Sequence, residues 1–441
     1  MLYRSLFLIL IFVSSVFTQS LTWLGSMGTP YAEVHGVSDD GMVVTGWAGV
    51  YSPHRAWRWT PSTGMQDIGS LAPGYDAEAW GLSADGQVIV GYGLIGVGSV
   101  YRGFRWKNDS MYQFGTFGGS VSWAYAASFD GSVVAGSAEH SNGYNHAFRW
   151  TADSGMQDLG VLPGALRSVA RGVSADGRVV VGWSGFENQV HHAFRWENGV
   201  MVDIHNPALY GSEALGVSDD GNVVVGAWGP NMLTPARAFR WTASTGMYDL
   251  GTLGGNWSEA WDANYNGSIV VGWAERSTGN WGAFRWKETT GMQDLNVLYA
   301  NLLTPGSVLR DAFAISSNGR YIAGRGYNAA TGRNEAYLLD TQGTSVAEKS
   351  ENLQIASRLY QNYPNPFSRV TTITYEIPFR TSVQLEVYDG LGRKVGTLVN
   401  EIQNAGKYSV KFVADNFSNG IYFYTLKTEK SVNVNRMELL K

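Results

Sequence analysis

Residues 172–203 read GVSADGRVVVGWSGFENQVHHAFRWENGVMVD, and this stretch decides the fold. A Ser-x-Asp-Gly turn, Ser174–Gly177, joins two apolar runs, and Asp-Gly between such runs is a strong hairpin signal. The segments HAFRW (192–196) and VMVD (200–203) follow, separated by another short turn. The stretch therefore predicts four short antiparallel strands, named A to D in chain order. Strand A enters the Asp-Gly turn, and strand C carries AFRW.

The same unit occurs seven times along the chain. Its turn glycines are 44 to 52 residues apart: Gly41, Gly86, Gly131, Gly177, Gly221, Gly267 and Gly319. Another glycine stands five residues after each of them, in strand B: Gly46, Gly91, Gly136, Gly182, Gly226, Gly272 and Gly324. The AFRW signature keeps the same period, and its seventh copy is AYLL at 336–339. Four strands in a repeat of this length predict an all-β fold, a seven-bladed β-propeller with four-stranded blades.

The ring is expected to close on its N-terminal strand. The seventh unit ends near Asp340 without a strand D, and Leu21–Gly25 precedes the first strand A. We therefore expect Leu21–Gly25 to pair with Ala336–Asp340. A second expectation is that the AFRW arginine pairs with an aspartate of strand D, as Arg58/Asp67, Arg149/Asp158, Arg195/Asp203, Arg240/Asp249 and Arg285/Asp294. Both partners are missing from the seventh blade, as expected if either would be costly to bury alone.

The composition of the chain excludes several chemistries, and its first residues predict a secreted protein. There is no Cys among 441 residues, which excludes thiol catalysis and disulfides. The net charge is −5 without a basic stripe, so nucleic acid is not an expected partner. Arg4, the apolar run Leu6–Val16 and the polar residues after it predict a signal peptide over residues 1–20. No later segment is apolar enough for a transmembrane span.

The propeller units resemble a known extracellular repeat. They are similar to the HAF repeat, whose His-Ala-Phe is complete at His146–Phe148 and His192–Phe194. The resemblance covers about residues 21–340 and implies a secreted or surface protein. It brings no agreed catalytic residues.

A different region follows the propeller. A polar linker is expected over residues 341–355, and residues 356–441 show short alternating strands that predict a small antiparallel β-sandwich. This region is similar to the C-terminal sorting domain of the type IX secretion system. The matching motifs are YPNPF (363–367), YDGLGRKV (388–395), NGIYFYTL (419–426) and the basic-hydrophobic end (436–441). The resemblance implies that the type IX machinery is a partner, with translocation across the outer membrane and usually removal of the domain.

No catalytic signature is present, and we expect no catalytic residues, metal or cofactor. The AFRW arginines could form an acidic-sugar site as in sialidases, but their strict recurrence favours a structural role. One carboxylate per Ser-x-Asp-Gly turn is too few for calcium, so we expect these aspartates to shape the turns. The seven histidines are expected to be structural. The adjacent His191 and His192 point to opposite faces of a strand, so they could bind a metal only with partners from other blades.

The variable B–C and D–A connections are expected to share one face of the propeller and to carry the function. Aromatic residues gather there, Trp257 and Trp261 among them, and could stack on sugar rings. The leading hypothesis is therefore a non-enzymatic surface or extracellular binding protein with a glycan or protein ligand. The alternative is a secreted carbohydrate-active hydrolase or lyase, which would need carboxylates converging in one pocket.

The predicted site is the mouth of the central channel on that face. Near the start of strand A stand Glu33, Glu78, Trp123, Val169, Glu213, Glu259 and Asp311. Just before each AFRW stand Arg55, Arg102, His146, His192, Arg237, Gly282 and Glu335. In blades one, two and five a glutamate and an arginine are expected to neutralise each other. Glu259, Asp311 and Glu335 lack such a partner and, with Trp257 and Trp261, are the predicted ligand-binding residues. The opposing expectation is that Arg310, Arg325 or Arg333 neutralises the three acids.

Overall fold

The computed structural model describes residues 19–98, 100–229, 236–342, 357–377, 381–390, 393–403, 406–428 and 432–441. The predicted signal peptide (1–20) and linker (341–355) lie outside these residues, apart from two residues of each. Helical structure in the described part is limited to α1 (Leu295–Leu298) and one 3₁₀ turn (Ala300–Leu302). Neither is long or apolar enough to cross a membrane.

The described strands of the propeller follow the predicted order in every unit. Strand A is β2 (Ala32–Val37), β6 (Ala77–Leu82), β10 (Gly118–Ala127), β14 (Arg167–Val173), β18 (Ser212–Val217), β22 (Gly254–Ala263) and β26 (Val308–Ile315). Strand B is β3 (Val44–Ala48), β7 (Ile89–Leu94), β11 (Val133–His140), β15 (Val179–Gly185), β19 (Val223–Trp228), β23 (Ile269–Arg276) and β27 (Tyr321–Asn328). Strand C is β4 (Arg55–Thr60), β8 (Tyr101–Lys107), β12 (Asn145–Thr151), β16 (His191–Glu197), β20 (Arg237–Thr242), β24 (Trp281–Lys287) and β28 (Arg333–Asp340). Strand D is β5 (Gly64–Asp67), β9 (Ser110–Gln113), β13 (Gly155–Asp158), β17 (Val200–Asp203), β21 (Gly246–Asp249) and β25 (Gly291–Asp294).

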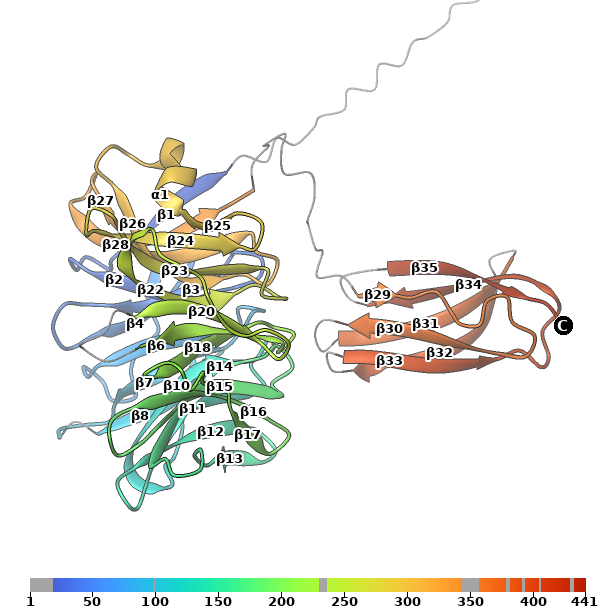
Figure 1. The fold of residues 1–441 in the computed structure, drawn as a ribbon, viewed down its shortest axis with the longest axis horizontal. Helices are drawn as coiled ribbons and strands as arrows, with labels where there is room; N and C mark the ends of the chain where they lie inside the picture. Colours follow the sequence, from blue (N-terminus) through green and yellow to red (C-terminus); the bar gives the residue numbers. More distant parts are fainter. Residues whose placement is uncertain are drawn as a thin grey trace, which may run out of the picture.

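These strands form seven four-stranded antiparallel sheets, and the N-terminal strand closes the ring as predicted. Strand β1 (Ser20–Gly25) completes the last sheet, whose order is β1-β28-β27-β26. Leu21 lies opposite Leu339, and Trp23 lies opposite Tyr337. In Figure 1 the blue N-terminal strand lies among the yellow and orange strands of the last blade. The two ends of the propeller are therefore held in one sheet, which leaves no gap between first and last blades.

The Ser-x-Asp-Gly turns hold their shape through their own side chains, as expected. In the first turn Ser38 Oγ donates to Asp40 Oδ1 (2.7 Å), and the amide of Met42 donates to the same oxygen (3.0 Å). Gly41 adopts a φ of 69°, which an L side chain rarely adopts. The turns of neighbouring blades are also joined by backbone hydrogen bonds, such as Ala175 N–H to Asp219 O (3.0 Å). Between the seventh and first blades the Asp39 carboxylate accepts from Ser317 N–H (2.8 Å).

The AFRW segment joins neighbouring blades, but the predicted arginine–aspartate pairs are wrong. Arg149 lies opposite Gln157, whereas Asp158 lies opposite Phe148 and so belongs to the other face of the blade. The guanidinium instead reaches the next blade, where Arg149 Nε donates to the turn carbonyl of Gly177 (2.8 Å). Arg105, Arg195 and Arg240 make the equivalent bond to the turns at Gly131, Gly221 and Gly267. The structural role expected for these arginines is therefore confirmed, with a different acceptor.

The C-terminal region forms two further sheets. One has the order β29-β30-β33, with bounds Arg358–Leu359, Val370–Ile377 and Gly406–Val413. The other has the order β32-β31-β34-β35, with bounds Lys394–Gln403, Thr381–Asp389, Gly420–Lys427 and Val432–Leu439. Ile373 and Tyr375 of the first sheet share one buried core with Leu385 and Tyr424 of the second. The predicted antiparallel sandwich is therefore confirmed.

The strand B glycines should be intolerant of any side chain. A Cβ on Gly136 would lie 2.0 Å from the carbonyl oxygen of Trp123, whereas a Cβ on Gly115 would meet nothing within 4 Å. Gly136→Ala should therefore destabilise the propeller by an amount at the upper end of the roughly 1–3 kcal/mol typical of overpacking. Gly115→Ala is the matched control and should melt like the parent chain. Equal melting temperatures for the two variants would show that the close approach does not constrain the blade.

Candidate functional site

Each inner strand carries a β-bulge that aims one side chain into the central channel. In β14, for example, the pairing with β15 shifts after Ala170, so that Arg171 is left without a partner residue. A bulge re-aims the extra residue and bends the strand. The seven residues skipped in this way are His35, Trp80, Tyr125, Arg171, Leu215, Trp261 and Phe313. All seven line a channel cavity of about 170 Å³.

The seven bulged residues form one layer of the channel, which contains mainly aromatic rings and one arginine. The ring of His35 stacks on Trp80 with centroids 4.1 Å apart and lies 5.2 Å from Phe313. The guanidinium of Arg171 lies over the ring of Tyr125, 4.3 Å from its centroid. These seven positions hold six different residue types, although the strands around them repeat. This layer is therefore where the repeat gives way to an asymmetric surface.

Two polar atoms of this layer, His35 Nε2 and Arg171 Nε, are buried without a hydrogen-bond partner in the described structure, and the buried Trp261 Nε1 lies toward the Glu259 carboxyl group without a well-formed hydrogen bond. Burial, followed by the charges of Arg171 and Arg325, lowers the pKa of His35 to about 3, so its imidazole is neutral at physiological pH. Unpaired buried polar atoms are costly. An arginine and an indole can only donate, so this layer can hold a ligand oxygen.

Acidic side chains surround the mouth of the channel, one tier above the bulges. Five of the seven positions are Glu33, Glu78, Glu213, Glu259 and Asp311, and the other two are Trp123 and Val169. The expected neutralisation of Glu78 by Arg102 and of Glu213 by Arg237 is wrong. Their partners are histidines of the preceding blade, His54 for Glu78 (2.7 Å) and His191 for Glu213 (2.5 Å).

In the first and seventh blades one arginine serves two acids. Arg325 forms an ion pair with Asp311, which lies directly opposite it in the sheet, and its Nη1 lies 3.6 Å from Glu33. Arg55, the expected partner of Glu33, donates to the carbonyl of Met27 instead. The physical reason is distance, because directly opposite residues on adjacent strands are about 5 Å apart at Cβ, whereas strand C lies two strands away.

The predicted ligand-binding residues are only partly brought together. Asp311 and Trp261 line the mouth pocket, and Asp311 is neutralised by Arg325, one of the three arginines considered. Glu335 is buried in the β27–β28 hairpin, where it accepts from Asn328 Nδ2 and Thr331 Oγ1, each at 2.8 Å. The premise that Asp311 and Glu335 lack partners is therefore wrong. Trp257 and Glu259 are partly buried in β22 and do not line the pocket.

Glu259 nevertheless has an unusual environment beneath the mouth. Burial, followed by repulsion from the Glu213 carboxylate, raises the pKa of Glu259 to about 7. Glu259 is therefore partly protonated near neutral pH, whereas Glu213 has a polar partner of its own in His191.

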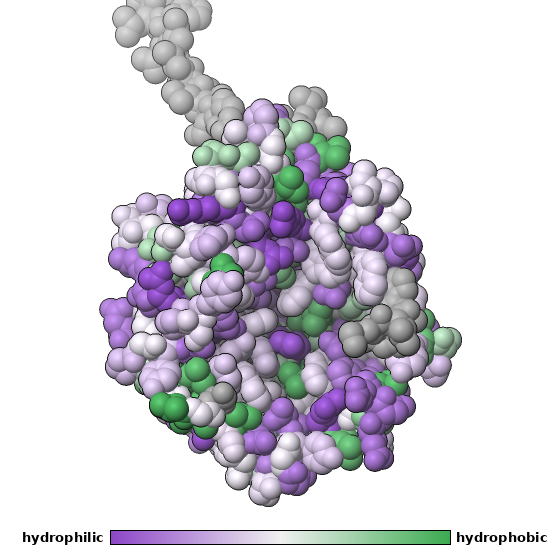
Figure 2. Space-filling view, turned by 90° about the vertical axis from the view of Figure 1, so that its left-hand side faces the viewer, coloured by the Kyte–Doolittle hydropathy of each residue, from purple (hydrophilic) through white to green (hydrophobic). Residues whose placement is uncertain are grey.

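The mouth opens into a pocket of about 740 Å³ on the face that carries the B–C loops, and four tryptophans stand among the residues that line it. Trp80, Trp261, Trp273 and Trp281 line it, and Trp281 is 45% exposed. Trp273 packs against Trp281 with ring centroids 4.2 Å apart. Arg276, Arg310 and Arg325 add positive charge beside Glu33 and Asp311. Figure 2 shows a face of the molecule that is hollowed near its centre, with hydrophilic and hydrophobic side chains both bordering the hollow.

Several of these residues were missed by the sequence reasoning, although a periodic signal marks them. The residue directly after each strand B glycine faces the mouth position: Trp47, Tyr92, Ser137, Trp183, Ala227, Trp273 and Arg325. The residue two places before each A-F-R-W copy packs toward the next blade, as His54, His191 and Trp281 do. Each position lies one residue from a position used in the sequence analysis, the strand B glycine or the residue just before AFRW. In a strand, a shift of one residue moves the side chain to the other face of the sheet.

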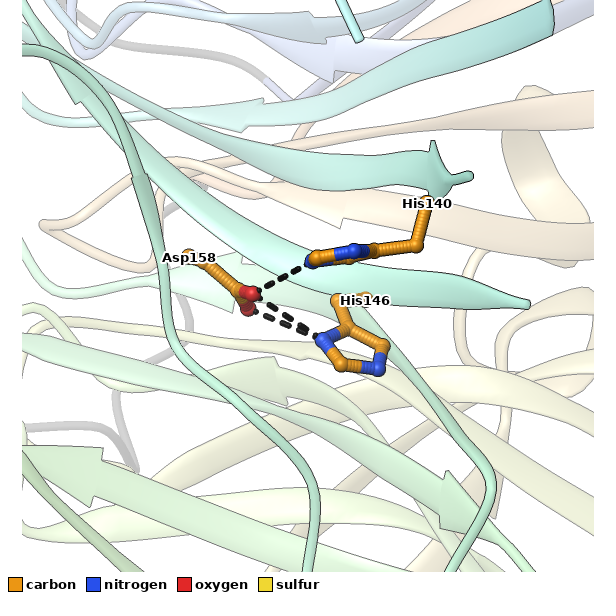
Figure 3. Close-up of side chains that lie close together, drawn as sticks. All are labelled: His140, His146 and Asp158. Carbon is orange, nitrogen blue, oxygen red and sulfur yellow. Dashed lines mark hydrogen bonds and ion pairs between the residues drawn. The ribbon is translucent and has the colours of Figure 1, made fainter. Parts of the chain in front are cut away.

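A second cluster lies at the edge of the third blade. Asp158 accepts from His140 Nε2 (2.8 Å) and His146 Nδ1 (3.0 Å), and the donor atoms of the three residues lie within 4.8 Å of one another (Figure 3). Burial acts to raise the pKa of Asp158, but hydrogen bonds from Gly160 N–H and the two imidazoles hold it below its usual value. Among the described residues this is the one group of His, Asp and Glu side chains arranged closely enough to hold a metal ion.

Comparison with known proteins identifies the C-terminal region. Residues 361–438 match the family model of the secretion system C-terminal sorting domain. The chain therefore carries a type IX sorting domain and is exported to the cell surface or the extracellular space. No curated protein matches the chain by sequence.

Solved structures with the same kind of fold are only distantly similar. An oligogalacturonate lyase from Vibrio parahaemolyticus is 10% identical, with a TM-score of 0.46 over 74% of this chain and 96% of that chain. TolB from Acinetobacter baumannii is 12% identical, with a TM-score of 0.40 over 69% and 82%. PorZ of Porphyromonas gingivalis, a surface component of the type IX secretion system, is 11% identical, with a TM-score of 0.42 over 91% and 58%. At these scores the likeness concerns the fold alone, and the resemblance to HAF repeats stays a prediction.

The raised pKa of Glu259 predicts a pH-dependent stability difference. Between about pH 4.5 and 7 the unfolded chain loses a proton that folded Glu259 keeps, so this residue destabilises the fold increasingly as the pH rises. The free energy of unfolding of Glu259→Gln should therefore exceed that of the parent chain by a margin that grows across that window to about 3 kcal/mol. Above pH 7 this margin should stay nearly constant. Thermal melting at pH 5, 6, 7 and 8 measures this, with Glu187→Gln in an exposed loop as the control. A difference that is the same at every pH would contradict the assignment.

Proposed function

We propose that this chain is an exported, non-enzymatic binding protein whose propeller takes its ligand at the mouth of the central channel. The observation that carries the proposal is the pocket walled by four tryptophans above a layer of unpartnered donor atoms. Concave, aromatic-lined pockets with a few convergent polar groups are the usual form of ligand sites. The carboxylates that line the pocket, Glu33 and Asp311, both contact Arg325, which suits binding better than proton transfer.

The chemistry of the pocket favours a hydroxylated ligand such as a glycan. Indole faces offer flat apolar surfaces to the C–H faces of sugar rings, and Trp281 is exposed enough to be reached. Deeper in the channel, Arg171 and Trp261 can donate to a hydroxyl or carboxylate oxygen. Among the described residues Arg171 has no carboxylate within salt-bridge distance, so an acidic group on the glycan would give it a partner. A protein ligand presenting the same groups is the alternative.

A secreted carbohydrate-active hydrolase or lyase is the second candidate, and one observation favours it. Repulsion from the Glu213 carboxylate, added to burial, raises the pKa of Glu259 to about 7, and a carboxyl group with a raised pKa is the usual general acid of glycoside hydrolysis. Neither residue lines the mouth pocket. A substrate would have to reach them past Trp261 and Trp273, so we rank this function second.

The export route and the domain limits belong to the same proposal. A signal peptide over residues 1–20 would take the chain across the inner membrane, and the type IX machinery would recognise residues 356–441. The propeller (21–340) would then be the delivered cargo, released or attached to the surface after removal of the sorting domain. The match to residues 361–438 supports the second step.

Truncation of the exposed indole should separate binding from folding. Trp281→Ala removes one wall of the pocket from a side chain that is 45% exposed, so the fold should survive. Binding of the glycan that gives the strongest signal on an array should weaken about tenfold, the loss of a contact of about 1.4 kcal/mol. Tyr248→Ala, an exposed aromatic on β21 outside the pocket, is the matched control and should bind normally.

Two results would overturn this proposal. If Trp281→Ala and Tyr248→Ala bind alike, the pocket is not the ligand site. If the parent chain degrades any polysaccharide in a turnover screen and Glu259→Gln does not, the enzymatic candidate replaces the binding function.

A further inference from the structure

We propose that His140, His146 and Asp158 form a binding site for a divalent transition-metal ion of the zinc class. His140 ends β11, His146 lies in β12 and Asp158 ends β13, so three adjacent strands supply one ligand each. Figure 3 shows both imidazole rings approaching the same carboxylate. The site is separate from the channel mouth, and the inference does not depend on the proposed ligand there.

The repeat itself shows that this arrangement exceeds what the scaffold needs. In the fifth and sixth blades the strand D aspartate has one cationic partner, Arg237 for Asp249 and Arg276 for Asp294. In the third blade the two positions corresponding to Arg237 and Arg276 are both histidine, and both contact Asp158. An arginine cannot bind a metal ion, whereas a neutral imidazole is among the commonest metal ligands. The third blade therefore replaces a simple ion pair with a set of three ligands.

The donor geometry suits a tetrahedral ion. Zinc bonds of about 2.0–2.2 Å to imidazole nitrogen and carboxylate oxygen place neighbouring ligand atoms roughly 3.3 Å apart in a tetrahedron. The carboxylate oxygen of Asp158 lies 2.8 Å from His140 Nε2 and 3.0 Å from His146 Nδ1, within a few tenths of an ångström of that spacing, and all three donor atoms lie within 4.8 Å of one another. Two nitrogen donors favour zinc over calcium or magnesium, which prefer oxygen.

The surroundings hold the ligands while leaving access from solvent. Gly160 N–H donates to Asp158 Oδ1 (2.8 Å), which fixes the carboxylate as an outer-shell partner would. Phe117 packs against the ring of His140 at 5.3 Å between centroids. The side chains of His140 and Asp158 are each 32% exposed, so a fourth ligand, water or a group on a partner, can reach the ion.

The fourth blade offers a natural comparison. His192 contacts Asp203 at 2.8 Å, as His146 contacts Asp158. The other histidine nearby, His205, is stacked on His192 at 4.0 Å between centroids. Its Nδ1 is hydrogen-bonded to Ser212 Oγ (2.8 Å). The fourth blade therefore has the same ion pair without the third converging donor.

Calorimetric titration of the purified full chain with zinc chloride tests the proposal. The parent chain should bind one Zn²⁺, and His146→Gln and Asp158→Asn should each weaken that binding by at least about 100-fold, because loss of even an outer-shell partner costs 10- to 100-fold. His192→Gln in the fourth blade should bind like the parent. Titration with Co²⁺ should give the visible absorption of a tetrahedral complex in the parent and in His192→Gln only.

Three results would overturn the proposal: no zinc binding by the parent chain, unchanged binding after His146→Gln, or equal loss after His192→Gln. Far-ultraviolet circular dichroism and melting temperature show whether each variant is folded. If Asp158→Asn does not fold, His140→Gln takes its place, because His140 is partly exposed at the end of its strand.

Discussion

A carbonyl oxygen packed against a glycine governs the geometry of every blade. In all seven, a Cβ on the strand B glycine would lie 1.8 to 2.0 Å from the carbonyl oxygen of the mouth residue in strand A, from Glu33 in the first blade to Asp311 in the last. Only glycine permits this approach. The approach accompanies the bulge that turns the next-but-one residue into the channel. One repeated backbone contact therefore produces both the ring of mouth residues and the layer of channel residues.

This arrangement lets a repetitive scaffold carry a unique surface. Arginine-to-turn bonds and Asp-shaped turns recur from blade to blade, whereas six different residue types occupy the seven bulged positions. The departures gather in blades six, seven and one. Asp262 stands where four other blades have glycine, and its carboxylate accepts from Ile315 N–H of the next blade (2.9 Å). Arg325 serves two acids from neighbouring blades. The tryptophan pocket opens beside these residues, which is the asymmetry that a specific ligand requires.

Periodicity alone predicted the blade number, the strand order, the closing strand and the role of the turn aspartates. It could not predict which side chains meet, because alternation in a strand makes the answer depend on a single residue of register. Arg149 was expected to reach Asp158 but points to the next blade, and the bulge after Ala124 shifts the pairing of the inner strand. Arg325 was one candidate among three for Asp311, and only its position directly opposite singles it out. His140, His146 and Asp158 lie on three different strands, β11, β12 and β13. Their convergence depends on the register of all three strands, which the sequence spacing does not give.

The central claim is that bulged residues bind ligand while repeated residues hold the ring together. Two half-buried arginines separate these roles: Arg171 belongs to the channel layer, and Arg149 binds the turn of the next blade. The most direct measurement is the dissociation constant for the best array glycan and the melting temperature of Arg171→Met and Arg149→Met. Our account predicts that Arg171→Met loses binding by at least about tenfold with its melting temperature kept, and that Arg149→Met melts earlier but binds normally. Unchanged binding by Arg171→Met, or equal loss of binding by both variants, would contradict it.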